Sequence, residues 1–241
     1  MPRKKKPEII NDQDIDRIVG SIRKTKIKTH KFEFSEKQSE LLKIIFDQNT
    51  KIVFISGPAG TSKTFMAIYA AMHLFNMNND YAISYVRSII ESADRGMGAL
   101  PGTVDEKFCP FMMPLTDKLH ELTAATEAKL MIDKGIVSAM PINYLRGASF
   151  KDQIIIADES QNFTAKELIT LLTRIGENTK MLICGDPMQS DINGKSGYQS
   201  IIDVFNDEHS VKQGIHNFKF TFKDIKRSEI LKFIVKKLEK M

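Results

Sequence analysis

The sequence predicts a single α/β domain in which a mostly parallel sheet carries helices on both faces. The chain has 241 residues, a length that suits one large domain of this class. Short apolar runs alternate along it with patterns of helical spacing, which is typical of parallel strands buried between helices. A glycine-containing stretch, residues 57–64, joins the first apolar run after residue 50 to a helical pattern, and this context predicts a phosphate-binding loop.

The elements are predicted from the spacing of apolar residues. The first helix begins after Ser35, an N-cap candidate, and continues through Leu41, Leu42 and Ile45. Further helices are predicted at residues 64–76, 115–131 and 166–175. Strands are predicted at residues 51–56, 81–86, 135–140, 152–157 and 180–184. Residues 96–114 are dense in Gly, Pro and Met, so we expect a structured loop there.

The net charge of +5 is concentrated at the two ends of the chain. Residues 1–31 carry a net charge of +6 and residues 218–241 carry +5, whereas the 186 residues between them carry −6. We expect residues 1–31 to form a basic, partly disordered extension and residues 32–241 to form one domain that ends in a basic helix. Such basic segments favour contact with a polyanion such as a nucleic-acid backbone, and solvated termini are the alternative.

The composition argues against several other classes of protein. No apolar run approaches the roughly 20 residues that span a bilayer, and no apolar segment follows the charged N-terminus as it would in a secretory signal. We therefore expect a cytoplasmic protein that has no membrane segment. The two cysteines, Cys109 and Cys184, are far apart and lack metal-site spacing, so neither a disulfide framework nor a zinc site is predicted.

The predicted phosphate-binding loop places a lysine and a threonine at its end. In such a loop the lysine reaches the β- and γ-phosphates, the last hydroxyl binds Mg²⁺, and backbone N–H groups cradle the phosphates. Ser62 stands where the usual pattern has Gly, which costs energy only if this residue needs a positive φ. A strand-to-helix turn that binds nothing is the alternative. The nucleotide-binding residues expected from the loop are Gly57, Pro58, Ala59, Gly60, Thr61, Ser62, Lys63 and Thr64.

Acidic and polar residues follow two of the later strands. Asp158 and Glu159 come directly after the run at 152–157, where ligands of open α/β sheets bind. Asp158 is expected to hold Mg²⁺ through water, and Glu159 to orient or deprotonate an attacking water molecule. Gln189 follows the run at 180–184 and is a candidate to hydrogen-bond the γ-phosphate or this water. Gln38, upstream of the first strand, is a candidate to bind an adenine edge.

Together these residues resemble the PhoH family of single-domain P-loop ATPases, which is related to the first half of superfamily 1 helicases. The resemblance covers most of residues 34–235 and is carried by these motifs: Gly57-Pro-Ala-Gly-Thr-Ser-Lys-Thr64, Val86-Arg87, Gly98-Ala-Leu-Pro-Gly102, Asn143-Tyr-Leu-Arg-Gly147, Ala157-Asp-Glu-Ser-Gln-Asn162, Leu172-Thr-Arg-Ile-Gly176, Gly185-Asp-Pro-Met-Gln-Ser-Asp191 and Lys226-Arg-Ser228. The sequence departs from the family pattern at Ser62, at Ser160, where Ala is usual, and at Ser228, where His is usual.

The resemblance implies a RecA-like ATPase domain over residues 32–241, ATP and Mg²⁺ as cofactors, and a hexameric ring linked to RNA metabolism. Superfamily 1 helicases complete their ATP site between two RecA-like halves, whereas this chain has room for one. A second copy is therefore expected to supply the missing wall and an arginine that stabilises the transferring phosphoryl group. Arg227 is the first candidate for this arginine, followed by Arg174 and Arg146.

The leading hypothesis is a ring ATPase, a helicase or translocase, that acts on single-stranded nucleic acid, with RNA favoured over DNA. Arg87, residues 96–102 and the lysine-rich termini are candidates for the strand-binding surface. A small-molecule phosphotransferase and a non-catalytic nucleotide-binding scaffold stay open as alternatives.

Overall fold

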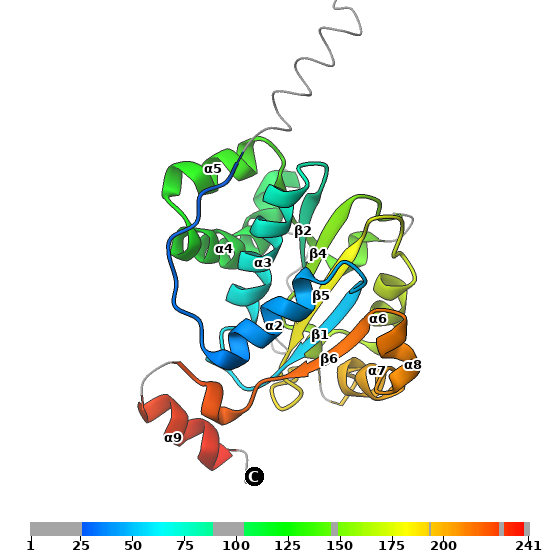
Figure 1. The fold of residues 1–241 in the computed structure, drawn as a ribbon. Helices are drawn as coiled ribbons and strands as arrows, with labels where there is room; N and C mark the ends of the chain where they lie inside the picture. Colours follow the sequence, from blue (N-terminus) through cyan, green and yellow to red (C-terminus); the bar gives the residue numbers. More distant parts are fainter. Residues whose placement is uncertain (1–25, 89–103, 146–148, 193, 227–228, 239–241) are drawn as a thin grey trace, which may run out of the picture.

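The computed structural model describes residues 26–88, 104–145, 149–192, 194–226 and 229–238. Within them, six strands form one sheet in the order β3-β2-β4-β5-β1-β6, and every neighbouring pair is parallel (Figure 1). The strands are β1 (Ile52–Ser56), β2 (Ala82–Arg87), β3 (Val137–Pro141), β4 (Gln153–Ala157), β5 (Lys180–Gly185) and β6 (Ile215–Lys219). The predicted parallel sheet is confirmed. The edge strand β6 was not predicted, because its polar sequence contains no apolar run.

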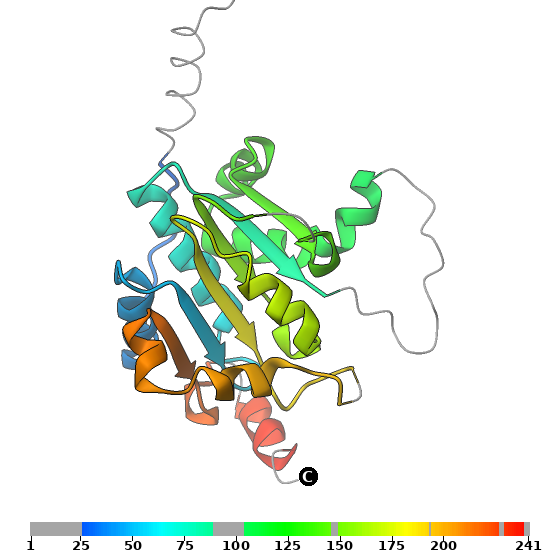
Figure 2. The same ribbon diagram turned by 90° about the vertical axis from the view of Figure 1, so that its right-hand side faces the viewer.

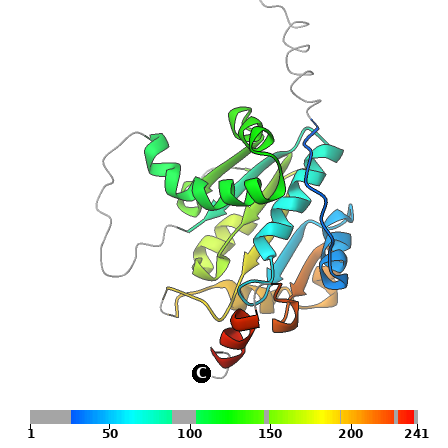
Figure 3. The same cartoon turned by 90° about the vertical axis from the view of Figure 1, so that its left-hand side faces the viewer.

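Helices cover both faces of the sheet, as predicted. One face carries α2 (Glu36–Phe46), α3 (Lys63–Met77), α4 (Val104–Leu122) and α5 (Ala125–Asp133). The other carries α6 (Ala165–Leu172), α7 (Tyr198–Val204) and α8 (Glu208–Lys212) (Figure 2). Successive residues of β1 therefore enter different cores: Val53 and Ile55 pack towards α3, whereas Phe54 packs towards α7. The last helix, α9 (Glu229–Leu238), projects from the body of the domain (Figure 3).

Two of the predicted boundaries are wrong. The loop predicted for residues 96–114 ends earlier, because α4 begins at Val104 and runs through two prolines. The single helix predicted for residues 115–131 is two helices, since α4 ends at Leu122 and α5 begins at Ala125. Between them the hydroxyl of Thr123 donates to the carbonyl of Lys28. The contact with Lys28 and the burial of the apolar side of α4 depend on the tertiary structure. The local sequence pattern therefore does not predict where these two helices begin and end.

The N-terminal segment 26–31 is packed against the domain, although the sequence assigns it to the basic extension. Ile27 is 2% exposed, and the Asn76 side chain hydrogen-bonds both its N–H and its carbonyl at 2.8 Å. The N–H of His30 donates to the carbonyl of Leu122 at 2.8 Å. The domain body therefore includes residues 26–31, while residues 1–25 lie outside the described part of the chain. Of the helices in the described ranges, none has both the length and the apolar character needed to cross a membrane.

Candidate functional site

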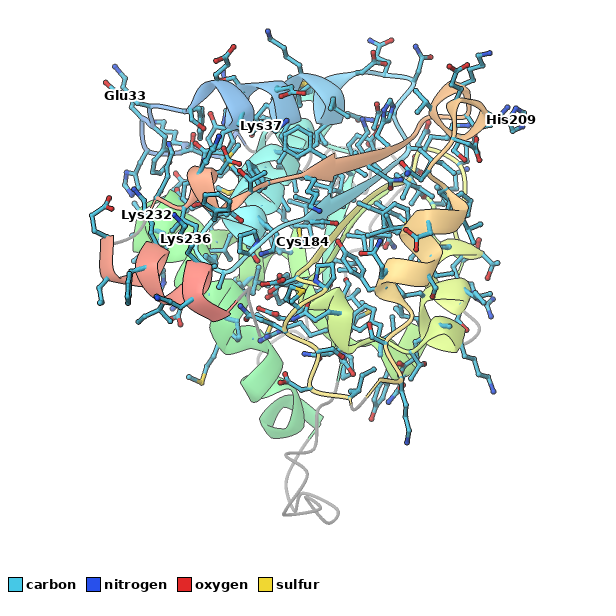
Figure 4. All side chains as sticks on the ribbon, turned by 90° about the horizontal axis from the view of Figure 1, so that it is seen from below. Glu33, Lys37, Cys184, His209, Lys232 and Lys236 are labelled. Atoms are coloured by element: carbon cyan, nitrogen blue, oxygen red, sulfur yellow. The ribbon has the colours of Figure 1, made fainter. Side chains whose placement is uncertain are left out.

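A cavity of about 450 Å³ lies at the carboxyl ends of the central strands. Because all the strands are parallel, the segments that follow β1, β4 and β5 meet at this edge. Figure 4 views the molecule from this side, with Cys184 near the centre and Lys232 and Lys236 of α9 to one side. The residues that line the cavity are Ala59, Gly60, Ser62, Lys63, Thr64, Phe65, Tyr85, Arg87, Pro114, Lys118, Glu121, Asp158, Glu159, Cys184 and Gly185.

The loop at residues 57–64 connects β1 to α3 and is closed by its own lysine. The Lys63 ammonium donates to the carbonyl of Gly57 at 2.6 Å and to that of Pro58 at 3.1 Å. The Thr61 hydroxyl donates to the carbonyl of Pro58 at 2.8 Å. Gly57 is required here, because a Cβ atom at this position would lie 2.7 Å from Cβ of Phe220. The loop thus holds its lysine and the N-terminus of α3 at the cavity wall, where an anionic group can replace the two carbonyls.

Ser62 occupies a backbone conformation that favours glycine. Its φ is 66° and its ψ is 27°, which is the left-handed region. Its side chain makes no capping hydrogen bond to α3. A residue with a Cβ atom in this region carries a steric cost of roughly 1–2 kcal/mol. The condition under which Ser62 costs conformational energy is therefore met, and this explains why glycine is usual at the position.

Replacing this residue by glycine is expected to stabilise the protein. Ser62→Gly should raise the free energy of unfolding by about 0.5–1 kcal/mol, because relief of the left-handed strain exceeds the extra chain entropy of glycine. Denaturant unfolding of the two proteins measures this difference. Ser62→Ala serves as the control, since it removes the hydroxyl but keeps the Cβ atom. Equal stabilisation by Ser62→Ala would contradict the assignment to backbone strain.

Thr64 and Asp158 lie together, although they are 94 residues apart in the chain. The Thr64 hydroxyl donates to Oδ1 of Asp158 at 2.6 Å, and Asp158 is 5% exposed. The backbone N–H of Asp158 donates to the carbonyl of Val86 at 2.9 Å and so fixes the residue at the end of β4. A hydroxyl and a carboxylate are the hard oxygen donors that Mg²⁺ prefers. The pair therefore fits a magnesium ion held beside the phosphate-binding loop.

Two residues of β2 approach the second oxygen of Asp158. The Tyr85 hydroxyl donates to Oδ2 at 2.5 Å, and Nε of Arg87 lies 3.9 Å from the same oxygen. Burial, together with the charge and hydrogen bond of Asp158, raises the pKa of Tyr85 above its ordinary value, so the phenol stays protonated and donates. Tyr85 was not predicted as a site residue, because a tyrosine within an apolar strand has the pattern of a core residue.

Glu159 lines the cavity next to Asp158 and is held by a glutamine. Its φ of 51° lies in the left-handed region, and Nε2 of Gln161 donates to its Oε2 at 2.6 Å. The Oε1 atom of Gln161 accepts from the N–H of Asp186 at 2.9 Å, so this buried side chain ties Glu159 to the segment after β5. Gln161 lies in the motif at residues 157–162, but its contact with both Glu159 and Asp186 depends on the tertiary structure, which brings the segment after β4 next to the segment after β5.

The turn after β5 is joined to the same region but directs Gln189 elsewhere. Asn162 and Asp191 exchange two hydrogen bonds: the Asn162 amide donates to Oδ2 at 3.1 Å, and the Asp191 N–H donates back to Oδ1 of Asn162 at 2.8 Å. The N–H of Gln189 donates to the carbonyl of Asp186 at 3.0 Å. Gln189 is exposed and is not among the residues that line the cavity. Its predicted contact with a phosphate or water stays a prediction.

Gln38 and Arg174, two further predicted site residues, are not among the residues that line the cavity. Gln38 is 3% exposed, and its Oε1 accepts from the N–H of Ser35 at 3.1 Å in a capping box of α2. The carbonyl of Arg174 accepts from the N–H of Phe150 just before β4, which places Arg174 at the opposite edge of the sheet. Arg146, Arg227 and the motif at residues 98–102 lie outside the described part of the chain.

The residues of α4 that form one wall of the cavity were not predicted from the sequence. Pro114, Lys118 and Glu121 of α4 line it, and Lys118 Nζ lies 2.7 Å from Oε1 of Glu121. These residues carry no motif, and Pro114 fell in a segment predicted as a loop. Their helical repeat of three and four residues places them on one side of α4. A prediction that α4 starts at Val104 would have placed these three residues on one side of a helix and so identified them.

Comparisons with known proteins identify relatives over most of the chain. The family model described as PhoH-like protein matches residues 32–239. A PhoH-like protein of Mycobacterium tuberculosis is 35% identical over 191 residues, covering 78% of this chain and 53% of the relative. One of Bacillus subtilis is 32% identical over 189 residues, covering 78% and 58%. The chain thus spans about half the length of these curated relatives.

Solved structures with a similar arrangement of elements include two Pif1 proteins. The crystal structure of Pif1 helicase from Candida albicans matches with a TM-score of 0.39 and 16% identity, covering 80% of this chain and 41% of the other. The structure of unliganded Pif1 from Bacteroides sp. matches with a TM-score of 0.43 and 14% identity, covering 85% and 45%.

Proposed function

The chain belongs to the PhoH-like protein family and is a nucleotide-binding P-loop protein, and on this premise we propose that it is a Mg²⁺-dependent ATPase that acts on single-stranded nucleic acid, RNA in particular. The observation that carries the proposal is the 2.6 Å hydrogen bond between Thr64 and Asp158. It joins the phosphate-binding loop to the end of β4, and Glu159 lines the same cavity beside it. A metal-binding pair and a carboxylate base are the two parts that hydrolysis of a phosphoanhydride requires.

The residues of this chain have separate roles in the proposed reaction. The loop N–H groups and the Lys63 ammonium bind the β- and γ-phosphates, as Lys63 exchanges its two carbonyl partners for phosphate oxygens. Thr64 and Asp158 would hold Mg²⁺, which would neutralise part of the charge on the phosphates. Water attacks the γ-phosphorus, its proton passes to Glu159, and the bond to the β–γ bridging oxygen breaks to leave ADP and phosphate. Gln161 holds the Glu159 carboxylate in place for this proton transfer.

The charge distribution supports a nucleic-acid partner. The two ends of the chain carry +6 and +5, and the described part of the C-terminal segment includes Lys232, Lys236 and Lys237 on α9. Arg87 adds a further basic side chain at the end of β2, where it lines the cavity. Basic side chains that track a phosphate backbone bind single strands without sequence preference.

The exposed face of α9 supports assembly of several copies into a ring. Ile230, Phe233 and Ile234 are 62%, 57% and 44% exposed, and their spacing places them on one side of the helix. Apolar faces of this kind are typical of interfaces between subunits.

The position of Arg174 also fits a site shared between copies. Arg174 lies at the edge of the sheet opposite the cavity of its own chain, so it could take part in hydrolysis only in the cavity of a neighbouring copy. The N–H of Lys226 donates to the carbonyl of Gly60 at 3.2 Å, so Lys226 lies beside the phosphate-binding loop of its own chain.

The function is tested by measuring phosphate release from ATP with and without single-stranded RNA. RNA is expected to stimulate hydrolysis several-fold at low salt, and the stimulation should fall steeply between about 50 and 200 mM salt, because counterion release drives binding to a phosphate backbone. Single-stranded DNA of the same sequence measures the preference for RNA. Hydrolysis that neither strand changes would rule out the nucleic-acid part of the proposal, and ATP binding without any hydrolysis would favour the scaffold alternative.

A further inference from the structure

Tyr85 is a buried polar residue beside the site, and the proposed reaction does not assign it a role. It is 0% exposed, yet it is among the residues that line the cavity, and its hydroxyl contacts Asp158. The backbone is fixed on both sides, because Tyr85 pairs with Ala139 of β3 and Ile156 of β4 in the sheet. Sheet pairing fixes the Cα–Cβ direction and full burial restricts the ring, so the hydroxyl lies at a defined point near Asp158.

The two oxygens of Asp158 have different partners. Oδ1 accepts from Thr64 at 2.6 Å, and Oδ2 accepts from Tyr85 at 2.5 Å. Two hydrogen bonds at opposite oxygens fix the plane of the carboxylate, whereas one alone would let it rotate about the bond to Cβ. Because Tyr85 donates as a neutral phenol, it satisfies Oδ2 without cancelling the negative charge that attracts a cation. The more distant Arg87, 3.9 Å from Oδ2, would cancel part of that charge if it alone held the oxygen.

We propose that Tyr85 is a positioning residue for magnesium: its hydroxyl orients the Asp158 carboxylate and thereby sets how strongly nucleotide binding depends on Mg²⁺. This inference rests on the proposed function, since it assigns a partner to the same metal-binding pair. Groups that hydrogen-bond a metal-binding side chain commonly change metal affinity by 10–100-fold when they are removed. Tyr85 belongs to this class of residue, and a phenylalanine in its place keeps the packed volume while it removes the donor.

The test compares ADP binding with Mg²⁺ and with EDTA in the wild-type protein and in Tyr85→Phe. We expect Tyr85→Phe to raise the Kd of ADP in Mg²⁺ by about tenfold or more, while the Kd in EDTA stays within about twofold of wild type. A role in folding alone would move both constants together. Isothermal titration calorimetry measures both constants without turnover.

The matched control is Tyr198→Phe. Tyr198 is also 0% exposed, and its hydroxyl donates to the carbonyls of Ile55 and Ile183 at 3.1 and 3.2 Å rather than to Asp158. Its loss is expected to lower stability but to leave the ratio of the two ADP constants unchanged. A second test uses Asp158→Asn as the background: there Tyr85→Phe should add no further loss of Mg²⁺ dependence, because the residue through which it acts is already altered.

The outcomes separate this inference from the function on which it rests. Mg²⁺-dependent ADP binding in the wild type with the same ratio in Tyr85→Phe would overturn the positioning role alone. An equal rise of both constants, or a further loss in the Asp158→Asn background, would overturn it as well. Failure of the wild type to bind ADP in Mg²⁺ would overturn the proposed function and the role of Tyr85 with it.

Discussion

Lys63→Ala is expected to abolish ATP hydrolysis, with a loss of at least about 10²-fold in the rate of phosphate release. The substitution removes the cation that would contact the β- and γ-phosphates. It also removes the two hydrogen bonds, at 2.6 and 3.1 Å, by which Lys63 closes the loop on Gly57 and Pro58. Because binding and catalysis both use this ammonium group, the affinity for ATP should fall together with the rate. A phosphate-release assay and a nucleotide titration measure the two effects.

Lys51→Ala is the matched control for this substitution. Lys51 is exposed and precedes β1, so it lies at the end of the same strand that is remote from the cavity. The two variants have the same net charge, and only the loss of Lys63 should reduce the rate. Hydrolysis by Lys63→Ala at the wild-type rate would show that this loop is not the phosphate-binding site.

Glu159→Gln is expected to reduce hydrolysis by about 10²–10⁴-fold while the affinity for ATP changes little. The amide keeps the size of the side chain but cannot accept the proton of the attacking water. Single-turnover hydrolysis measures the chemical step, and equilibrium titration with ATP measures binding. Asp158 is unaltered in this variant, so nucleotide binding should depend on Mg²⁺ as it does in the wild type.

A matched carboxylate tests whether charge alone accounts for the effect. Glu177 is exposed and pairs with Lys151 at 3.1 Å, away from the cavity. Glu177→Gln makes the same change of charge and should hydrolyse ATP at the wild-type rate. If Glu159→Gln instead loses the Mg²⁺ dependence of ATP binding, Glu159 acts on the metal rather than as the base.

The predicted fold depended on patterns that are local in the chain. Five of the strands were predicted within two residues of their observed limits. Four of them, β1, β2, β4 and β5, are central strands, and parallel strands buried on both faces are continuous apolar runs. The edge strand β6 contains His216 and Asn217 and lacks such a run. The start of α4 was missed because Pro110 and Pro114 predict a loop, and the packing of Leu115 and Leu119 that accompanies the helix is tertiary.

The residues of the candidate site were also predicted to different extents from local patterns. Lys63, Thr64, Asp158 and Glu159 were predicted from short motifs, and the structure brings all of them to one cavity. Gln189 was predicted from its position after a strand, and the structure places it on the surface, outside the lining of the cavity. Position along a strand determines which edge of the sheet a residue reaches. It does not determine the direction of a side chain in the turn that follows.

The sequence by itself determined the class of the fold and the phosphate-binding loop, and it identified the residues proposed for the metal site and the base, because each depends on patterns that are local in the chain. Only the tertiary structure decided which groups hold those residues. Tyr85 and Asp158 are 73 positions apart, and Gln161 meets Asp186 across 25. Ser62 could be seen to depart from the usual pattern, but its φ of 66° depends on how the loop closes onto α3. Hydrogen bonds between distant segments form only when the sheet places their strands side by side, and a linear pattern contains no record of that placement.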